Sequence, residues 1–156
     1  MRLLANFNRI HIFEYRKIIT MKKLSLLFFV CLAFVLNSNA QHKVGEKLDS
    51  GLVAWVDAKG EHGIIVTNED LGKMKWDDAV KACAALGNGW HLPDKDELNK
   101  VYLNEPKIGG NFQKTPYWSS TEFKNKLSCW YQSMTSGVQD ANDVKSIHNV
   151  RAVKTF

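Results

Sequence analysis

The sequence GWHLPDKDEL at residues 89–98 is the stretch that decides the fold, because it joins an extended segment to a helix start. Pro93 disfavours helical backbone in the residue before it, so residues 90–92 are expected to be extended. On such a segment Trp90 and Leu92 point to one side and His91 points to the other. The stretch therefore predicts two inward apolar side chains and a histidine at the surface.

Helical patterns flank this stretch on both sides. Asp94 is a favourable N-cap residue, and Glu97 stands three residues later, where a capping box requires it. The second helix is therefore expected over about Lys95–Leu103, with Pro106 ending it. The first helix is expected over about Trp76–Leu86, and its buried face follows the i, i+3, i+4, i+7 spacing of Trp76, Ala79, Val80 and Cys83.

Short β-prone segments lie before and after the two helices. Residues 52–56 and 64–66 are separated by a turn-like segment and predict a hairpin. Later strands are expected over 117–121, 129–134 and 147–153, with a polar loop over 138–146. This order predicts an α+β fold in which two helices pack on short antiparallel strands.

The first forty residues are expected to be absent from the mature protein. Residues 21–40 hold two lysines, a mostly apolar run of 13 residues, and small residues before a cut after Ala40. This pattern is typical of a secretory signal peptide. The apolar run is too short to span the roughly 30 Å hydrocarbon core, so no stable membrane span is expected after cleavage. Residues 1–20 are interpreted as a mis-annotated extension upstream of the true start at Met21.

The expected cleavage changes the charge balance. The whole chain has a formal net charge of +5, but six of its 21 Lys and Arg residues and one of its 16 acidic residues precede Gln41. The mature chain therefore has 15 residues of each sign, and we expect no nucleic-acid partner. Residues 41–50 are expected to be a polar linker, and residues 51–156, which contain all five Trp, to form one domain.

Four motifs, in this order, resemble a known bacterial family. They are WxxAxxxC at 76–83, GWHLPxxxEL at 89–98, YWSSTE at 117–122 and VRAVK at 150–154. Together they look like the Lcl C-terminal domain and the related major paralogous domain proteins, over nearly the whole mature chain. Three positions depart from the usual pattern: His91 replaces Arg, Asp94 replaces Ser or Thr, and Ala152 replaces a Cys that many members have.

The resemblance implies a C-type-lectin-like fold in exported proteins. The expected function is a secreted, periplasmic or cell-surface, non-catalytic binding or adhesion module. Its expected partners are glycans or extracellular matrix proteins. The alternative is an enzyme, because formylglycine-generating enzymes share a lectin-like fold and use cysteines; that alternative rests on fold analogy alone.

The ligand is expected on the late strands and the loop at 137–146, since long polar connections carry ligand contacts in lectin-like folds. On the strand, one of the two aromatics should be in the core and the other nearer solvent. The alternative is that both aromatics are in the core and the loop is only solvated. The expected contact residues are Trp130, Tyr131, Gln132, Gln139, Asp140, Asn142 and Asp143.

The cysteines and histidines predict no catalytic or metal site. Export and the family resemblance together favour a disulfide between Cys83 and Cys129, and the alternative is two buried free thiols. His91 is interpreted as structural or at the surface rather than catalytic. The histidines lack metal-ligand spacing, and the segment 140–143 lacks the Glu and Gly of an EF-hand, so we expect no metal or other cofactor.

Overall fold

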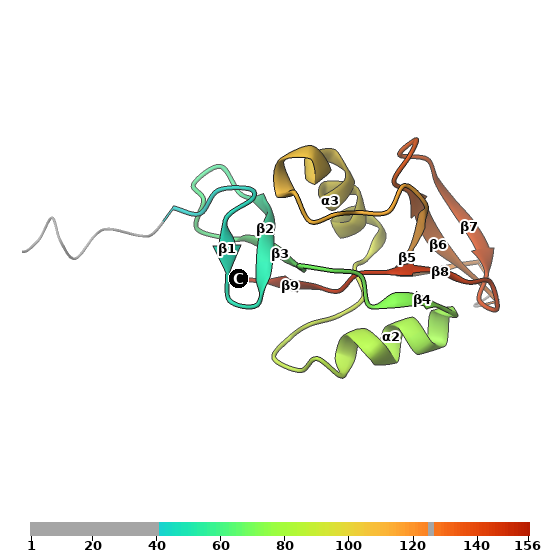
Figure 1. Ribbon diagram of the computed structural model, residues 1–156. Coiled ribbons are helices and arrows are strands. Elements are labelled where there is room, and N and C mark those ends of the chain that lie inside the picture. Colours follow the sequence, from blue (N-terminus) through green and yellow to red (C-terminus); the bar gives the residue numbers. More distant parts are fainter. Residues whose placement is uncertain (1–40, 125–126) are drawn as a thin grey trace, which may run out of the picture. The chain divides into compact units, whose positions relative to one another are not determined.

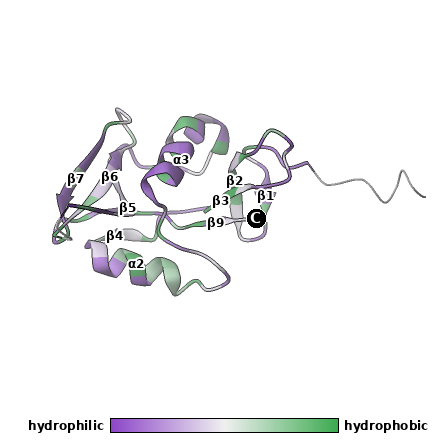
Figure 2. Cartoon of the chain, turned by 180° about the vertical axis from the view of Figure 1, so that it is seen from behind, coloured by the Kyte–Doolittle hydropathy of each residue, from purple (hydrophilic) through white to green (hydrophobic). Residues whose placement is uncertain are grey.

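The computed structural model describes residues 41–124 and 127–156. The predicted signal peptide and the extension before it lie outside the described residues. Two helices lie on opposite sides of the central strands, as Figures 1 and 2 show from two directions. The predicted α+β architecture is therefore confirmed. No helix in the described ranges is both long enough and apolar enough to cross a bilayer.

The first sheet is antiparallel and has the strand order β1-β2-β3-β9. Its central pair is the predicted hairpin, with a β-bulge between Val53 and Trp55. Val53, Ile64, Ile65 and Val66 of this pair are buried, which suits strands packed on both faces. The bounds are Lys47–Leu48 for β1, Gly51–Val56 for β2, Gly63–Thr67 for β3 and Val153–Thr155 for β9.

The second sheet has the strand order β4-β8-β5-β6-β7, and every pair except β5 with β8 is antiparallel. Its edge strand β7 is polar at every position except Ala141 and is mainly purple in Figure 2. The bounds are Gly72–Met74 for β4, Pro116–Phe123 for β5, Ser128–Ser133 for β6, Gln139–Asp143 for β7 and His148–Val150 for β8.

Two predictions about the late segments are wrong. The expected polar loop over 138–146 contains strand β7, because β6 offers it a complete row of pairing partners from Ser128 to Gln132. The expected single strand over 147–153 is two strands, β8 and β9, which belong to different sheets. The chain changes sheets at Arg151 and Ala152, and both of these residues are buried.

The helices are α2, Trp76–Ala84, and α3, Lys95–Ile108. The expectation that Pro106 ends the second helix is wrong, since α3 continues for another two residues. Ile108 is buried in the core and holds this last turn in place, which offsets the missing N–H of the proline. The helix ends at Gly109, whose φ of 73° is the left-handed cap conformation.

The stretch at residues 89–98 adopts the predicted conformation. Trp90 and Leu92 are buried, and His91 is partly exposed and forms an isolated bridge with Val153. The Asp94 carboxylate accepts from the backbone N–H groups of Asp96 and Glu97, at 2.8 and 2.7 Å. The Glu97 carboxylate accepts in turn from the Asp94 N–H at 2.9 Å, which completes the capping box.

The apolar side chains form two core clusters, one on each side of the strands. One cluster includes Ala79 and Cys83 of α2, and the other includes Leu98 and Val101 of α3. Cys129 lies in the same cluster as Cys83, but both are free thiols, so the expected disulfide is not formed in this structure. The two side chains act instead as small apolar core residues, which is the alternative considered from the sequence.

Candidate binding surface on strands β6 and β7

The residues expected to contact a ligand lie on two neighbouring strands at the edge of the second sheet. The register pairs Tyr131 with Asp140 and Gln132 with Gln139. Because residues that face each other in the ladder point to the same side, the set divides between the two faces of the sheet. One face has Trp130, Gln132, Gln139 and Asp143, and the other has Tyr131, Asp140 and Asn142.

Gln132 and Gln139 connect the strands to α3 and are not free for a ligand. Gln132 is fully buried, and its Nε2 donates to Asn99 Oδ1 at 2.9 Å and to the Gly137 carbonyl at 3.1 Å. Gln139 Nε2 donates to the Lys95 carbonyl at 2.7 Å. A buried amide that lost these partners would be costly, so Gln132 is structural, and the half-buried Gln139 has its amide N–H engaged by α3.

Tyr131 and Asn142 support the core on the opposite face. Tyr131 packs against the cluster that contains α2, and its ring centroid is 5.0 Å from that of His148. His148 also packs on Trp118, at 4.3 Å between centroids, and lies 3.3 Å from Asn142 Nδ2. Burial lowers the pKa of His148 and so favours its neutral form in this aromatic setting.

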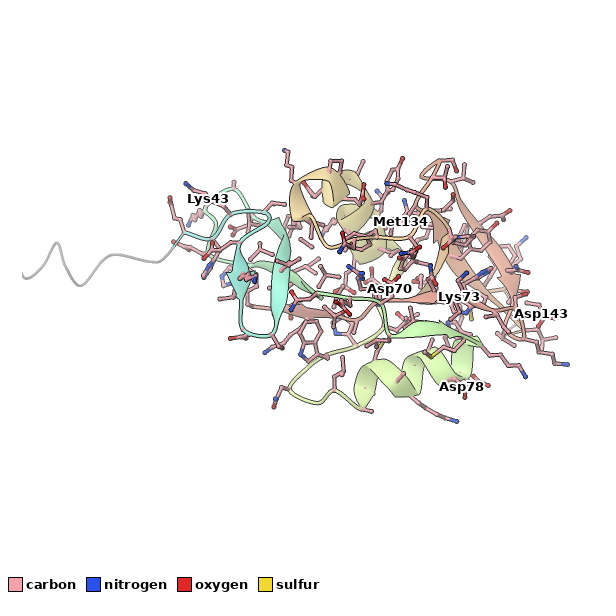
Figure 3. All side chains as sticks on the ribbon, in the orientation of Figure 1. Lys43, Asp70, Lys73, Asp78, Met134 and Asp143 are labelled. Atoms are coloured by element: carbon pink, nitrogen blue, oxygen red, sulfur yellow. The ribbon has the colours of Figure 1, made fainter. Side chains whose placement is uncertain are left out.

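Trp130 is the aromatic nearer solvent. It is half-buried and belongs to neither core cluster. The Lys95 ammonium lies 3.6 Å from its ring centroid, and Phe123 meets it edge-on at 5.4 Å. Asp143 is exposed on the same face at the outer end of β7 (Figure 3), while Asp140 is exposed on the other face. Trp130 and Asp143 are therefore the expected contact residues that remain available together.

A second polar site is centred on Arg151, which the sequence analysis did not single out beyond its motif. Arg151 is 3% exposed, and its Nε donates to Asp70 Oδ1 at 2.7 Å. Its Nη1 donates to the Gly110 carbonyl, and the Tyr117 hydroxyl donates to the other Asp70 oxygen at 2.7 Å. Burial and the Asp70 carboxylate raise the pKa of Tyr117, so its hydroxyl stays a donor.

This ion pair faces a pocket of about 250 Å³, which is lined by Glu69, Asp70, Asn111, Gln113 and Arg151. Figure 3 labels Asp70 near the middle of the view, and its side chain is 16% exposed. The two partners are 81 residues apart in the chain, so no local spacing in the sequence could have paired them. The signal in the sequence was that Arg151 lies in VRAVK, one of the four motifs that carry the family resemblance.

Neither of the two cysteines in the described ranges has the environment of a reactive thiol. Cys83 and Cys129 are both fully buried. Burial raises the pKa of Cys83 to about 12. Burial, together with the charges of Glu122 and Asp77, raises the pKa of Cys129 to about 11. Since the thiolate is the nucleophile, these thiols are poorly suited to covalent catalysis at neutral pH.

Residues 48–154 match the family model of the Lcl C-terminal domain. This chain is a member of the Lcl C-terminal domain family. The family resemblance drawn from the four motifs is thus confirmed, and the match contains both the β6–β7 surface and the Arg151 site. The α+β architecture of this Lcl C-terminal domain agrees with the C-type-lectin-like fold that the resemblance implied.

Comparison with solved structures finds botrocetin and the snake venom toxin convulxin among the similar chains. Botrocetin is 15% identical, with 69% of this chain and 93% of that chain covered and a TM-score of 0.42. Convulxin is 15% identical, with 71% and 92% covered and a TM-score of 0.40. A complex of botrocetin with a mutant von Willebrand factor A1 domain gives 14% identity, 60% and 91% coverage and a TM-score of 0.41. No curated protein matches the Lcl C-terminal domain chain.

Proposed function

We propose that this chain is an exported, non-catalytic binding module for an extracellular glycan or matrix protein. The ligand contacts the surface formed by Trp130, Phe123, Lys95 and Asp143, which we call the Trp130 surface. Family membership supports the proposal at the level of the domain, and the Trp130 surface supports it at the level of the site.

The position of Trp130 is the observation that carries this proposal. Its indole contributes to neither hydrophobic core, yet it is held in a defined orientation by Lys95 and Phe123. A rigid, amphipathic aromatic side chain at a surface suits stacking on a sugar ring or on an apolar group of a protein. The exposed Asp143 carboxylate, one oxygen of which accepts from the Lys145 N–H, adds a hydrogen-bond acceptor on the same face of the sheet, which suits a ligand that presents hydroxyl or N–H groups.

The test is a glycan and matrix-protein array probed with the purified protein, followed by titration of the ligand that it identifies. The Trp130→Ala variant should weaken binding by roughly tenfold, because a truncated aromatic anchor commonly costs more than 1 kcal/mol. Asp143→Asn should weaken it by a smaller factor, since the amide keeps the shape of the side chain but loses its charge.

The matched controls lie outside the Trp130 surface. Leu103→Ala removes an exposed apolar side chain of α3, and Asp78→Asn removes an exposed carboxylate of α2. Both controls should bind as the unmodified protein does. Full-strength binding by a folded Trp130→Ala variant would show that the ligand binds elsewhere on the molecule.

The enzyme alternative predicts a different result in a thiol titration. An enzyme that uses Cys83 or Cys129 should show a thiol that reacts rapidly in the folded protein. The burial and raised pKa of both groups favour no reaction until the protein unfolds, when both should be alkylated without a reductant. Rapid labelling of either cysteine in the folded protein would favour the enzyme hypothesis over the binding-module hypothesis.

A further inference from the structure

A cleft of about 390 Å³ lies between the first sheet and the beginning of α3, apart from the Trp130 surface. Residues of β2, β3 and β9 form one wall, and the first turns of α3 form the other. Figure 1 shows α3 beside β2. The side chains that give the cleft its chemistry are Trp55, His62, Asp94, Asp96, Glu97 and Lys100.

The charge of this cleft is predominantly negative, with three carboxylates and one ammonium group. Asp94 and Glu97 are engaged in the capping box, and Glu97 also contacts His91 at 3.0 Å. Asp96 is exposed, and none of the ion pairs among the described residues includes its carboxylate. The cleft therefore presents one free anionic acceptor at its rim.

The aromatic wall of the cleft already holds a cation. Lys100 Nζ lies 4.2 Å from the ring centroid of Trp55, which is within the range of a cation–π contact. Lys100 follows Asp96 by four residues, a spacing at which a helical carboxylate and amine often pair. The ammonium lies on the indole instead, so the Trp55 face is a cation site that Lys100 occupies, and Asp96 remains unpaired.

We propose that this cleft binds a lysine or arginine side chain presented by an extracellular protein partner. The ligand cation stacks on the Trp55 face in place of Lys100, and the Asp96 carboxylate pairs with it. An arginine fits better than a lysine, because a planar guanidinium can stack on the indole and bind the carboxylate through two N–H groups. The site is independent of the Trp130 surface, so either site can exist without the other.

Calorimetric titration with a capped tetra-arginine peptide at about 0.15 M salt tests the proposal. Asp96→Asn should weaken binding by roughly threefold to tenfold, because the paired charge is lost. Lys100→Met should strengthen binding, since the variant removes the internal competitor and leaves the cleft more negative. Trp55→Ala should weaken binding roughly as much as Asp96→Asn does.

Two matched controls separate this site from general charge attraction. Asp78 is an exposed first-turn carboxylate like Asp96, but it lies on α2 (Figure 3), so Asp78→Asn should leave the affinity unchanged. Trp130→Ala removes the other half-buried indole that holds a lysine, and it should also have no effect. Asp96 and Lys100 are not core residues, so their variants test the site even if Trp55→Ala does not fold.

Three results would overturn the proposal. The first is equal weakening by Asp96→Asn and Asp78→Asn, which would indicate diffuse attraction to surface carboxylates. The second is weaker binding by Lys100→Met, which would mean that the ammonium contributes to the ligand contact. The third is the absence of any heat of binding for tetra-arginine at millimolar concentration. If Trp130→Ala lost binding on the array but still bound tetra-arginine, the result would support the Trp130 surface and leave the cleft proposal unchanged.

Discussion

At the level of single residues, His91 links the extended segment to the first turn of α3. Its Nε2 lies 3.0 Å from Glu97 Oε2, and its Nδ1 lies 3.0 Å from the Gly89 carbonyl. Burial opposes protonation of His91, but the Gly89 carbonyl and the Glu97 carboxylate outweigh it and raise its pKa. The contact therefore stabilises the fold fully below the unfolded-state pKa of about 6.5, and this stabilisation is lost as pH rises through the folded-state pKa.

The His91→Gln variant should consequently lose more stability in mild acid than in mild base. We expect its free energy of unfolding to differ more from that of the unmodified protein at about pH 5.5 than at about pH 8.5. Urea denaturation at the two pH values measures this difference, with His62→Gln as the exposed histidine control. If His91→Gln lost the same free energy of unfolding at both pH values, the charge of His91 would not contribute to stability.

Arg151 shows what sequence patterns cannot report about a single residue. The sequence places it in a β-prone segment, where a charged side chain would be expected to face solvent. In the structure it is buried against Asp70 and stacks on Phe112, with 4.0 Å from its guanidinium carbon to the ring centroid. A buried cation is tolerated only beside such partners, and these come from distant parts of the chain.

At the level of elements, the two helices differ in how they begin. Asp94 caps α3 with its side chain, whereas Lys75 at the same position of α2 makes no side-chain cap. Both residues have the extended backbone that an N-cap requires, with ψ of 176° and 161°. The difference between the two starts is therefore one of side-chain chemistry alone.

Opposite stability changes are expected when the two caps are altered. Asp94→Ala should lower the free energy of unfolding by about 1 kcal/mol, because two N–H groups lose their acceptor. Lys75→Ser should raise it by roughly 0.5 to 1 kcal/mol, because it supplies an acceptor that α2 lacks. Urea denaturation at one pH compares the three proteins. An Asp94→Ala variant with an unchanged free energy of unfolding would contradict the role assigned to the capping box.

The bounds of the elements were predictable where short-range signals set them. The start of α3 follows from Pro93, Asp94 and Glu97, which act within a few residues of one another. The end of α3 does not follow from local signals, because Ile108 packs in the core beyond Pro106 and keeps the last turn helical. Strand β7 was missed for the same kind of reason, since its polar sequence becomes a strand only beside β6.

At the level of the whole molecule, export is a prediction that the described residues leave untested. We propose that the mature protein begins at Gln41, as the tripartite pattern of residues 21–40 indicates. Intact mass spectrometry of the exported protein should give the mass of residues 41–156. A mass that retains residues 21–40 would contradict cleavage, and one that retains residues 1–20 would contradict the start at Met21.

The sequence by itself determined the features that depend on neighbours within about one helical turn. These are the extended segment with Trp90 and Leu92 inward, the capping box and the buried face of α2. The four motifs also identified the family, because together they sample nearly the whole domain.

Only the tertiary structure decided which polar side chains remain available to a ligand. Gln132 and Gln139 became internal links to α3, while Trp130 stayed at the surface. Trp55 and Asp96 were placed across one cleft although they are far apart in the chain. The physical reason is that hydrogen bonding and burial depend on which segments meet in space, and sheet pairing brings together strands that no local spacing relates.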